Sequence, residues 1–236
     1  MKTVLFDLDG TLLPMDQDAF IATFLECVHR ELVRLGYSPE LAEAALAAAF
    51  PAVLANDGRE TNEKVFLGEF ERLVGARIQE DAPALADYYR GGFSEVKRTC
   101  GHEPRAALLL RELHDAGVPA VLATSPLFPR AATEARIGWA GLTPEDFTYI
   151  TTYENSSFCK PHLGYYRELL TRLSLDPRDC LMVGNDATED MVARELGIEV
   201  FLLTDHLVNR RGVEITALPH GDFGEMVDAV RSFIKK

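Results

Sequence analysis

The sequence predicts an α/β fold in which a doubly wound parallel sheet carries an inserted domain made only of helices. Three observations lead to this prediction. From about residue 96 onward, short apolar runs alternate with amphipathic stretches, which is the pattern of strands and helices in a parallel sheet. One more predicted strand, at 3–7, lies far earlier in the sequence than the strands with which it would pair. The segment 15–95 between them has helical periodicity and no convincing strand.

The first element is the strand at 3–7, which reads TVLFD. Val, Leu and Phe in a short block are typical of a buried strand. The apolar run stops at Asp7, a second carboxylate follows at Asp9, and Gly10 lets the chain turn sharply. Side chains two residues apart in an extended chain share a face, so Asp7 and Asp9 are expected to point into one small volume.

The inserted segment is predicted to hold a series of helices. Apolar residues spaced three and four apart mark the first helix, and Gly36 ends it. Ser38 followed by proline is a helix-start signal for the second. The expected helices span 16–35, 39 to near Pro51, 63–74, and 81 to about 90.

The second part of the chain is predicted to alternate between the two kinds of element. The expected strands are 118–123, 147–150, 180–183, 200–203 and 213–216, and the expected helices are 104–116, 131–137, 161–173, 188–196 and 222–234. We therefore assign 1–14 and 96–236 to one α/β domain and 15–95 to a helical cap domain. Ligands bind beyond the carboxyl ends of such strands, and the insertion leaves from that same end, where it is placed to act as a lid.

Composition limits the classes of function. With 24 basic and 37 acidic residues, the chain carries a net charge of −13, which argues against binding to nucleic acid or anionic membranes. No apolar run approaches the ~20 residues of a membrane span. The cysteines, Cys27, Cys100, Cys159 and Cys180, lack metal-type spacing and are expected to be reduced. The chain begins directly in a core strand without a signal peptide, so we expect a cytoplasmic protein. Its oligomeric state stays open between a monomer and a homodimer.

The pair Asp7 and Asp9 indicates phosphoryl chemistry. Two carboxylates that lie close together repel each other unless a cation joins them. Mg²⁺ prefers oxygen ligands and is usually held by one or two carboxylates together with substrate phosphate. A carboxylate is also a nucleophile that forms an aspartyl-phosphate. The alternative for a bare pair of this kind is an ordinary acidic turn after a strand.

Two more polar clusters follow predicted elements. Thr124 and Ser125 come directly after the strand 118–123, where hydroxyl and N–H groups can hold a phosphate oxygen; an ordinary helix cap is the alternative. Lys160 stands at the start of the helix 161–173. A cation at a helix N-terminus opposes the helix dipole, which is explicable if Lys160 faces an anion; a solvated lysine is the alternative.

The last cluster, Gly184 to Asp190, follows the strand 180–183. Glycine and acids after an apolar run suggest a metal site at the strand end, and an acidic helix cap at Asp186 is the alternative. Asn185 and Asp190 complete the cluster.

The strings DLDGT, TSP, KPHLGYY and GNDATED occur in this order. Together they resemble the motifs of the haloacid dehalogenase-like hydrolase superfamily, and the place of the insertion resembles its helical-cap subclass, which includes phosphoglycolate phosphatases and β-phosphoglucomutases. The resemblance implies a Rossmann-like core and Mg²⁺ as cofactor. It implies catalytic roles for Asp7, Asp9, Thr124 and Lys160, phosphate binding by Thr124, Ser125 and Lys160, metal binding by Asp7, Asp9 and Asp186, and supporting roles for Asn185 and Asp190. The family usually has an acid directly after the glycine of the fourth motif, whereas this chain has Asn185.

The resemblance implies a Mg²⁺-dependent phosphatase that acts on a small phosphomonoester through an aspartyl-phosphate. Asp9 argues against a dehalogenase, which the family pattern expects to lack it. The segment 15–95 carries 15 acidic and 7 basic residues, which favours a small monophosphate over a polyanion. Two alternatives stay open. A phosphomutase would use the same clusters, and a non-catalytic metal- or partner-binding module is the other class.

Overall fold

The structure, a computed structural model, describes residues 1–236, with Gly92 described by its backbone alone. The described residues form a sheet of six parallel strands in the order β3-β2-β1-β4-β5-β6. The strands are β1 (Thr3–Phe6), β2 (Ala120–Leu122), β3 (Tyr149–Ile150), β4 (Cys180–Gly184), β5 (Glu199–Leu203) and β6 (His220–Gly221). From the central β1 the chain builds outward on one side and then crosses to the other, which confirms the doubly wound α/β prediction.

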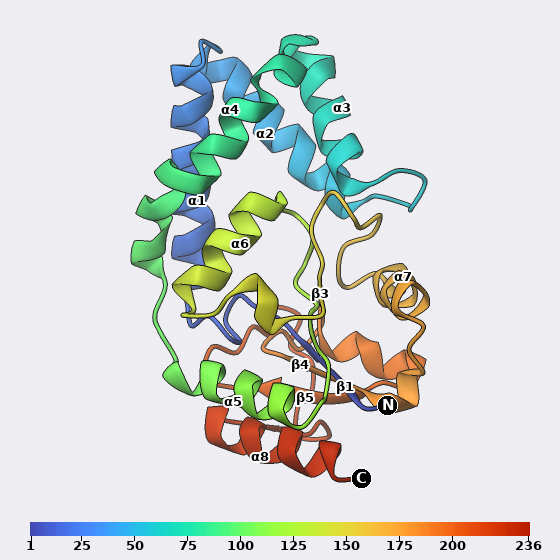
Figure 1. Cartoon of the computed structure of the whole chain (residues 1–236). Helices are drawn as coiled ribbons and strands as arrows, with labels where there is room; N and C mark the ends of the chain where they lie inside the picture. The colour runs from blue at the N-terminus through green and yellow to red at the C-terminus, as the bar shows by residue number, and fades with distance from the viewer.

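Helices cover both faces of this sheet (Figure 1). On one face α5 (Pro104–Asp115) and α8 (Phe223–Ile234) pack against the layer that contains Val4 and Phe6. On the other face α7 (Leu163–Leu173) and the 3₁₀ helix η4 (Met191–Leu196) pack against the layer that contains Leu5. Alternate residues of a strand point to opposite faces, so the apolar run of β1 supplies both cores.

The segment from α1 (Gln17–Arg34) to the 3₁₀ helix η1 (Gly92–Thr99), which precedes α5, is helical and lies beyond one end of the sheet. Between these two along the chain are α2 (Pro39–Leu54), α3 (Asn62–Val74) and α4 (Arg77–Gly91), and α1 to α4 lie in the upper part of Figure 1. α6 (Arg130–Trp139) lies between these helices and the sheet. The two connections run side by side, because Met15 and Cys100 form an antiparallel bridge and Gly101 N donates to Pro14 O at 2.7 Å.

Three of the four predicted helices in this segment begin with a capping side chain. The side chains of Asp16, Ser38 and Thr61 accept hydrogen bonds from backbone N–H groups three residues ahead. Such caps satisfy donors that a helix start otherwise leaves open. Two boundaries differ from the prediction, because α2 continues through Pro51 and α4 begins at Arg77, ahead of Asp81.

The predicted strand at 213–216 is wrong, and the edge strand of the sheet is β6 instead. The side chain of Asn209 bonds both backbone groups of Val213, at 2.8 Å and 2.9 Å. The Glu214 carboxylate accepts from Thr216 N at 3.1 Å. These local bonds occupy backbone groups that a strand ladder would need, so the β-branched residues here form a loop.

Two predicted helices also start later than expected. The helix after Lys160 begins at Leu163, and the His162 side chain caps it by accepting from Gly164 N at 2.9 Å. The segment 188–196 is helical only from Met191, as η4. Lys160 therefore lies in a connecting loop and not at the N-terminus of a helix.

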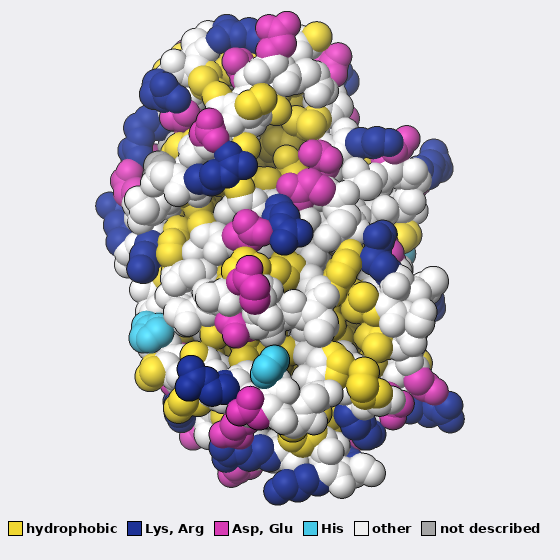
Figure 2. Space-filling view, viewed as in Figure 1, with side chains coloured by type: hydrophobic (Ala, Val, Ile, Leu, Met, Phe, Trp, Pro, Cys, Tyr) yellow, Lys and Arg dark blue, Asp and Glu magenta, His cyan; other side chains and the backbone are white. Residues whose placement is uncertain are grey.

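The surface carries charge of both signs. On the face shown in Figure 2, acidic and basic side chains are interspersed over the helical segment and the sheet layer alike. In the part of the chain that the structure describes, no helix has both the length and the apolar character that crossing a bilayer requires.

Candidate active site

The predicted site residues follow the carboxyl ends of neighbouring strands. Asp7 directly follows β1, and its N–H donates to Val183 O of β4 at 2.9 Å. Thr124 follows β2, and Asn185 directly follows β4. The strand order reverses between β1 and β4, and that point of an open α/β sheet is where ligands bind.

Lys160 joins two carboxylates at this edge. It is only 2% exposed, and its Nζ donates to Asp7 Oδ1 at 2.9 Å and to Asp190 Oδ1 at 2.6 Å. Burial acts to lower the pKa of Lys160, but Asp190 and Asp7 together raise it well above its usual value. Lys160 is therefore a fixed positive charge beside Asp7.

Other groups fix Asp190, so that its carboxylate can hold Lys160 in place. Its Oδ2 accepts from Asp186 N at 2.9 Å, and its carbonyl accepts from the hydroxyl of Tyr166 at 3.4 Å. A side chain at Gly184 would collide with the Asp190 carboxylate, so only glycine fits there. Asp190 therefore holds the ammonium group of Lys160 in place beside Asp7.

Asp9 has a cation of its own. Nη1 of Arg136, on α6, donates to Asp9 Oδ2, while Asp9 Oδ1 is buried and has no hydrogen-bond partner among the described residues. Burial raises the pKa of Asp9, against the lowering effect of Arg136 and with a further rise from Asp7. Asp7 and Asp9 are therefore paired with different basic residues.

The segment after β2 is anchored through its backbone and leaves its hydroxyls free. The Thr124 carbonyl accepts from Thr151 Oγ1 at 2.6 Å and from Tyr165 OH at 3.1 Å. Ser125 Oγ is buried and, within the described chain, without a partner. Buried polar atoms are normally hydrogen-bonded, so such an atom indicates a place for a ligand or water.

Asn185 connects two loops instead of facing outward. Its Oδ1 accepts from Thr11 Oγ1 at 3.2 Å and its Nδ2 donates to His206 O at 2.7 Å. Gly10, at φ +81°, lies so close that a side chain there would strike the Asn185 amide. Asn185 thereby fixes the turn that follows Asp7 and Asp9.

The oxygen atoms of the predicted metal site suit Mg²⁺ in kind. Within the described residues, Asp7 Oδ2, Asp186 Oδ2 and the Asp9 carbonyl take part in no hydrogen bond, whereas Asp186 Oδ1 accepts from Thr188 N and Glu189 N at 2.7 Å and 2.8 Å. Three hard oxygen donors match the preference of Mg²⁺. The described residues include no cluster of three or more His, Cys, Asp or Glu side chains that could hold a metal ion. Any metal would therefore depend on two carboxylates, a carbonyl and ligands from outside the chain.

Two buried residues at the site were not predicted from the sequence. Arg136 is 0% exposed, although an arginine in an amphipathic helix is usually solvated. Asn62, at the start of α3, is also 0% exposed, and its Nδ2 donates to Pro126 O at 3.1 Å and to Phe158 O at 3.4 Å. Asn62 therefore attaches the helical segment to the loops that carry Thr124 and Lys160. The sequence signal for either residue is weak, because its partners are distant in the chain.

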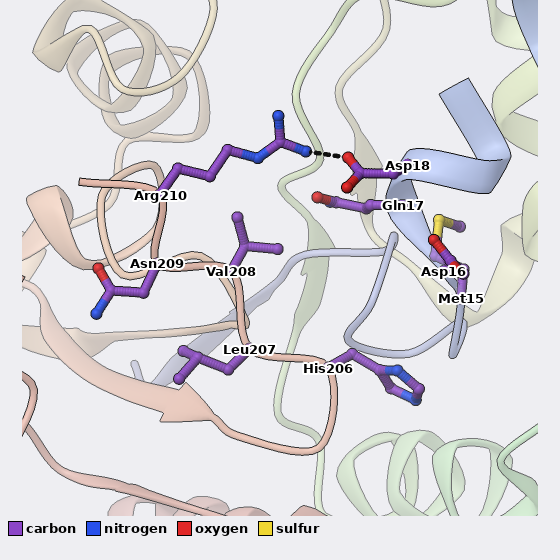
Figure 3. Close-up of a pocket in the computed structure, with 9 residues that line it drawn as sticks. All are labelled: Met15, Asp16, Gln17, Asp18, His206, Leu207, Val208, Asn209 and Arg210. Carbon is purple, nitrogen blue, oxygen red and sulfur yellow. Dashed lines mark hydrogen bonds and ion pairs between the residues drawn. The ribbon is translucent and has the colours of Figure 1, made fainter. Parts of the chain in front are cut away.

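A cleft lined by both polar and apolar residues opens beside the site. It has a volume of about 410 Å³ and lies between residues 15–18, where α1 begins, and residues 206–210, which follow β5 (Figure 3). Val208 pairs with Asp186 in a parallel bridge, so one wall of the cleft adjoins the loop after β4. Arg210 and Asp18 form an ion pair across the cleft, with Nη2 and Oδ1 2.5 Å apart.

Comparisons with known proteins agree with this architecture. A family model described as haloacid dehalogenase-like hydrolase matches residues 1–197. A bifunctional riboflavin kinase/FMN phosphatase of Arabidopsis thaliana is 32% identical over 148 residues, which are 61% of this chain and 38% of that protein. The chain thus spans well under half the length of this curated relative.

Solved structures share the fold. A HAD phosphatase from Thermococcus onnurineus is 21% identical, with 99% of this chain and 98% of that chain covered and a TM-score of 0.55. A predicted phosphoglycolate phosphatase from Haemophilus somnus is 18% identical, with 98% of both chains covered and a TM-score of 0.57. The family match extends over most of the chain and includes every motif from Asp7 to Asp190, so this protein belongs to the haloacid dehalogenase-like hydrolase family.

Proposed function

We propose that this protein is a Mg²⁺-dependent phosphatase that hydrolyses a small phosphomonoester through an aspartyl-phosphate on Asp7. The observation that carries the proposal is the buried contact of Lys160 with Asp7 at 2.9 Å, at the strand-order reversal of the sheet. A nucleophilic carboxylate needs a nearby positive charge that also attracts the phosphoryl group. Lys160 has that place and stays protonated.

In the first half of the reaction, Asp7 attacks phosphorus and the bond from phosphorus to the leaving oxygen breaks. The electron pair stays on the leaving oxygen, which takes the proton of Asp9 and departs as an alcohol. Thr124, Ser125 and Lys160 hold the other phosphoryl oxygens. Among the described residues, Ser125 Oγ is buried without a partner, and the hydrogen bonds of Thr124 engage its carbonyl and not its hydroxyl, which supports this role.

In the second half, a water molecule attacks phosphorus and gives its proton to Asp9. The bond between phosphorus and Asp7 breaks, which releases inorganic phosphate and restores both side chains. Asp9 thus acts first as an acid and then as a base. Its raised pKa supports this double role.

The proposed metal ligands are the Asp7 carboxylate, the Asp9 carbonyl and the Asp186 carboxylate. When bound, Mg²⁺ supplies charge neutralisation that lets an anionic nucleophile approach an anionic phosphoryl group. Asp190 keeps Lys160 in place, and Asn185 keeps the turn after Asp9 in place.

We further infer that residues 15–95 are a cap domain that acts as a lid, and that the alcohol part of the substrate reaches the site through the cleft of Figure 3. The paired connections at Met15 and Cys100 support a single hinge. Asn209 and Arg210 supply polar groups in the mixed lining of the cleft, which supports a small, polar phosphomonoester. The free state of Cys27, Cys100 and the other two cysteines supports a reducing compartment such as the cytoplasm.

The test is a phosphate-release screen with this purified chain over sugar phosphates, phosphoglycolate, glycerol phosphates, mononucleotides and FMN, the last because of the name of the Arabidopsis relative. We expect turnover of at least one compound with Mg²⁺, its loss on chelation with EDTA, and its loss in Asp7→Asn. Release of phosphate by Asp7→Asn at the wild-type rate, or no release from any compound with Mg²⁺ present, would overturn the proposal.

A further inference from the structure

All three nitrogen atoms of the Arg136 guanidinium donate hydrogen bonds. Its Nε donates to Ala132 O at 3.3 Å and its Nη2 donates to Thr133 Oγ1 at 3.3 Å, both within the same helix. Its guanidinium lies 4.3 Å from the centroid of the Phe128 ring. These contacts fix the orientation of the planar group, which leaves Nη1 directed at Asp9.

The Asp9 carboxylate is consequently bound on one side only. Its Oδ2 accepts from Arg136 Nη1, whereas its Oδ1 is buried and, among the described residues, has no partner. A buried carboxylate oxygen without a partner costs free energy. The lack of a partner is explained if Oδ1 is the atom that exchanges a proton with a group that is present only during the reaction.

We propose that Arg136 is the positioning residue for Asp9: it binds Oδ2, fixes the plane of the carboxylate, and directs Oδ1 toward the leaving oxygen and then toward the attacking water. The inference rests on the proposed function, in which Asp9 transfers the proton. In the first half, the proton passes from Oδ1 to the leaving oxygen as its bond to phosphorus breaks. The guanidinium then pairs with the carboxylate that remains, and in the second half Oδ1 takes a proton from water.

Two features separate this role from general support of the site. Arg136 lies on α6, whereas Lys160 lies in the loop before α7, and the two cations bind different carboxylates. Within the described chain, Arg136 forms no hydrogen bond or ion pair with Asp7 or Asp190. Removal of Arg136 should therefore impair the proton transfer more than the attack of Asp7 on phosphorus.

The experiment compares two substrates on the same enzyme preparation. p-Nitrophenyl phosphate has a phenolate that leaves readily without a proton, whereas an alkyl phosphate taken from the screen has an alcohol that needs one. The quantity measured is kcat/KM, which covers the steps up to the first irreversible bond cleavage. The ratio of the two values is independent of the fraction of enzyme that is folded, so it separates proton transfer from loss of stability.

We expect Arg136→Met to lower kcat/KM for the alkyl phosphate about tenfold to a hundredfold more than for p-nitrophenyl phosphate, as part of the 10²–10⁴-fold that acid–base catalysis supplies. Arg136→Lys, which keeps the charge but not the fork, should recover part of the ratio. In an Asp9→Asn background, Arg136→Met should not change the ratio further, because the group that it positions is already absent.

Arg130→Met is the matched control. Arg130 begins the same helix and binds Glu134 on the surface, so this variant makes the same chemical change away from Asp9. It should leave the ratio unchanged. An equal loss with both substrates in Arg136→Met, at an unchanged ratio, would show that Arg136 only supports the fold. A wild-type protein without phosphatase activity on either substrate would instead overturn the proposed function itself.

Discussion

The helical segment 15–95 and the edge of the sheet that carries the site differ in where their ion pairs lie and in how far apart in the chain the paired residues are. In the helical segment, ion pairs such as Glu60–Lys64 and Glu69–Arg72 join neighbours three or four residues apart at the surface. At the sheet edge, Lys160 and Arg136 are buried and bind carboxylates more than 120 residues away, Asp7 and Asp9. Exposed pairs contribute little to stability, whereas a buried charge depends on its partner.

This difference teaches where function constrains the chain. A buried ion pair often contributes less to stability than apolar residues of the same volume would. The burial of two basic residues at one edge of the sheet therefore favours chemistry there over stabilisation. Substitutions at matched positions of the two regions test that reading, and the largest effect is expected at Lys160.

Lys160→Met should destabilise the protein by about 3–5 kcal/mol, since it leaves two buried carboxylates without their cation. The matched substitution in the helical segment, Lys64→Met, should leave the unfolding midpoint unchanged because Lys64 and Glu60 are exposed. Urea unfolding followed by circular dichroism measures both variants. If Lys160→Met and Lys64→Met unfolded at the same urea concentration, the buried and the exposed ion pairs would not differ in their effect on stability.

Gly184→Ala should have the next largest effect. The added methyl group would meet the Asp190 carboxylate and displace it from Lys160, at a cost of about 1–3 kcal/mol for overpacking. Phosphatase activity should fall together with the melting temperature. Gly138→Ala on α6 is the control, because nothing lies within 4 Å of the added carbon. If Gly184→Ala retained full activity, the role of Asp190 in holding Lys160 would be refuted.

Asn62→Ala tests the attachment between the two regions. It removes hydrogen bonds to the loops of Thr124 and Lys160, each worth about 1 kcal/mol. The helical segment should then open more often, which limited proteolysis near residues 14–16 and 99–101 would detect as faster cleavage. Thr148→Ala, which removes a side-chain hydrogen bond to Ala120 O between β2 and the chain before β3, should not change that cleavage rate. Equal rates for wild type and Asn62→Ala would contradict the attachment.

The smallest effect concerns the buried thiols. Burial raises the pKa of Cys159 to about 12, so at neutral pH this side chain stays a thiol and reacts slowly. Cys100 is partly exposed and should be alkylated first by iodoacetamide. Peptide mapping after brief labelling gives the order. Labelling of Cys159 ahead of Cys100 in the folded protein would contradict the burial of Cys159.

The sequence predicted the features that depend on local pattern. The apolar block before Asp7 and the hydroxyl pair after the second strand were placed correctly, because strand ends in a parallel sheet converge on one edge. Lys160 was predicted to face an anion because it was expected at the N-terminus of a helix. The helix instead begins at Leu163, after the cap at His162, so that argument was wrong although Lys160 does contact Asp7. The strand predicted at 213–216 failed because the Asn209 side chain takes up the backbone groups of Val213.

Arg136 and Asn62 lay beyond prediction for a different reason. Each is a polar residue on a helix, and local periodicity makes a solvent-facing position the expected one. Their burial depends on partners 127 and 64 residues away, Asp9 and Pro126. One sequence does not indicate which residues so far apart in the chain come into contact. The fold brings these groups together.

The central claim is that phosphorus becomes covalently bonded to Asp7. Asp9→Asn with p-nitrophenyl phosphate tests it most directly, because this substrate needs no proton to leave while the attacking water lacks its base. Acid-quenched protein should then carry one phosphoryl group, which peptide mass spectrometry should locate at Asp7. Release of p-nitrophenolate with phosphate in equal amounts at every time, and no phosphorylated peptide from residues 1–14, would contradict the account.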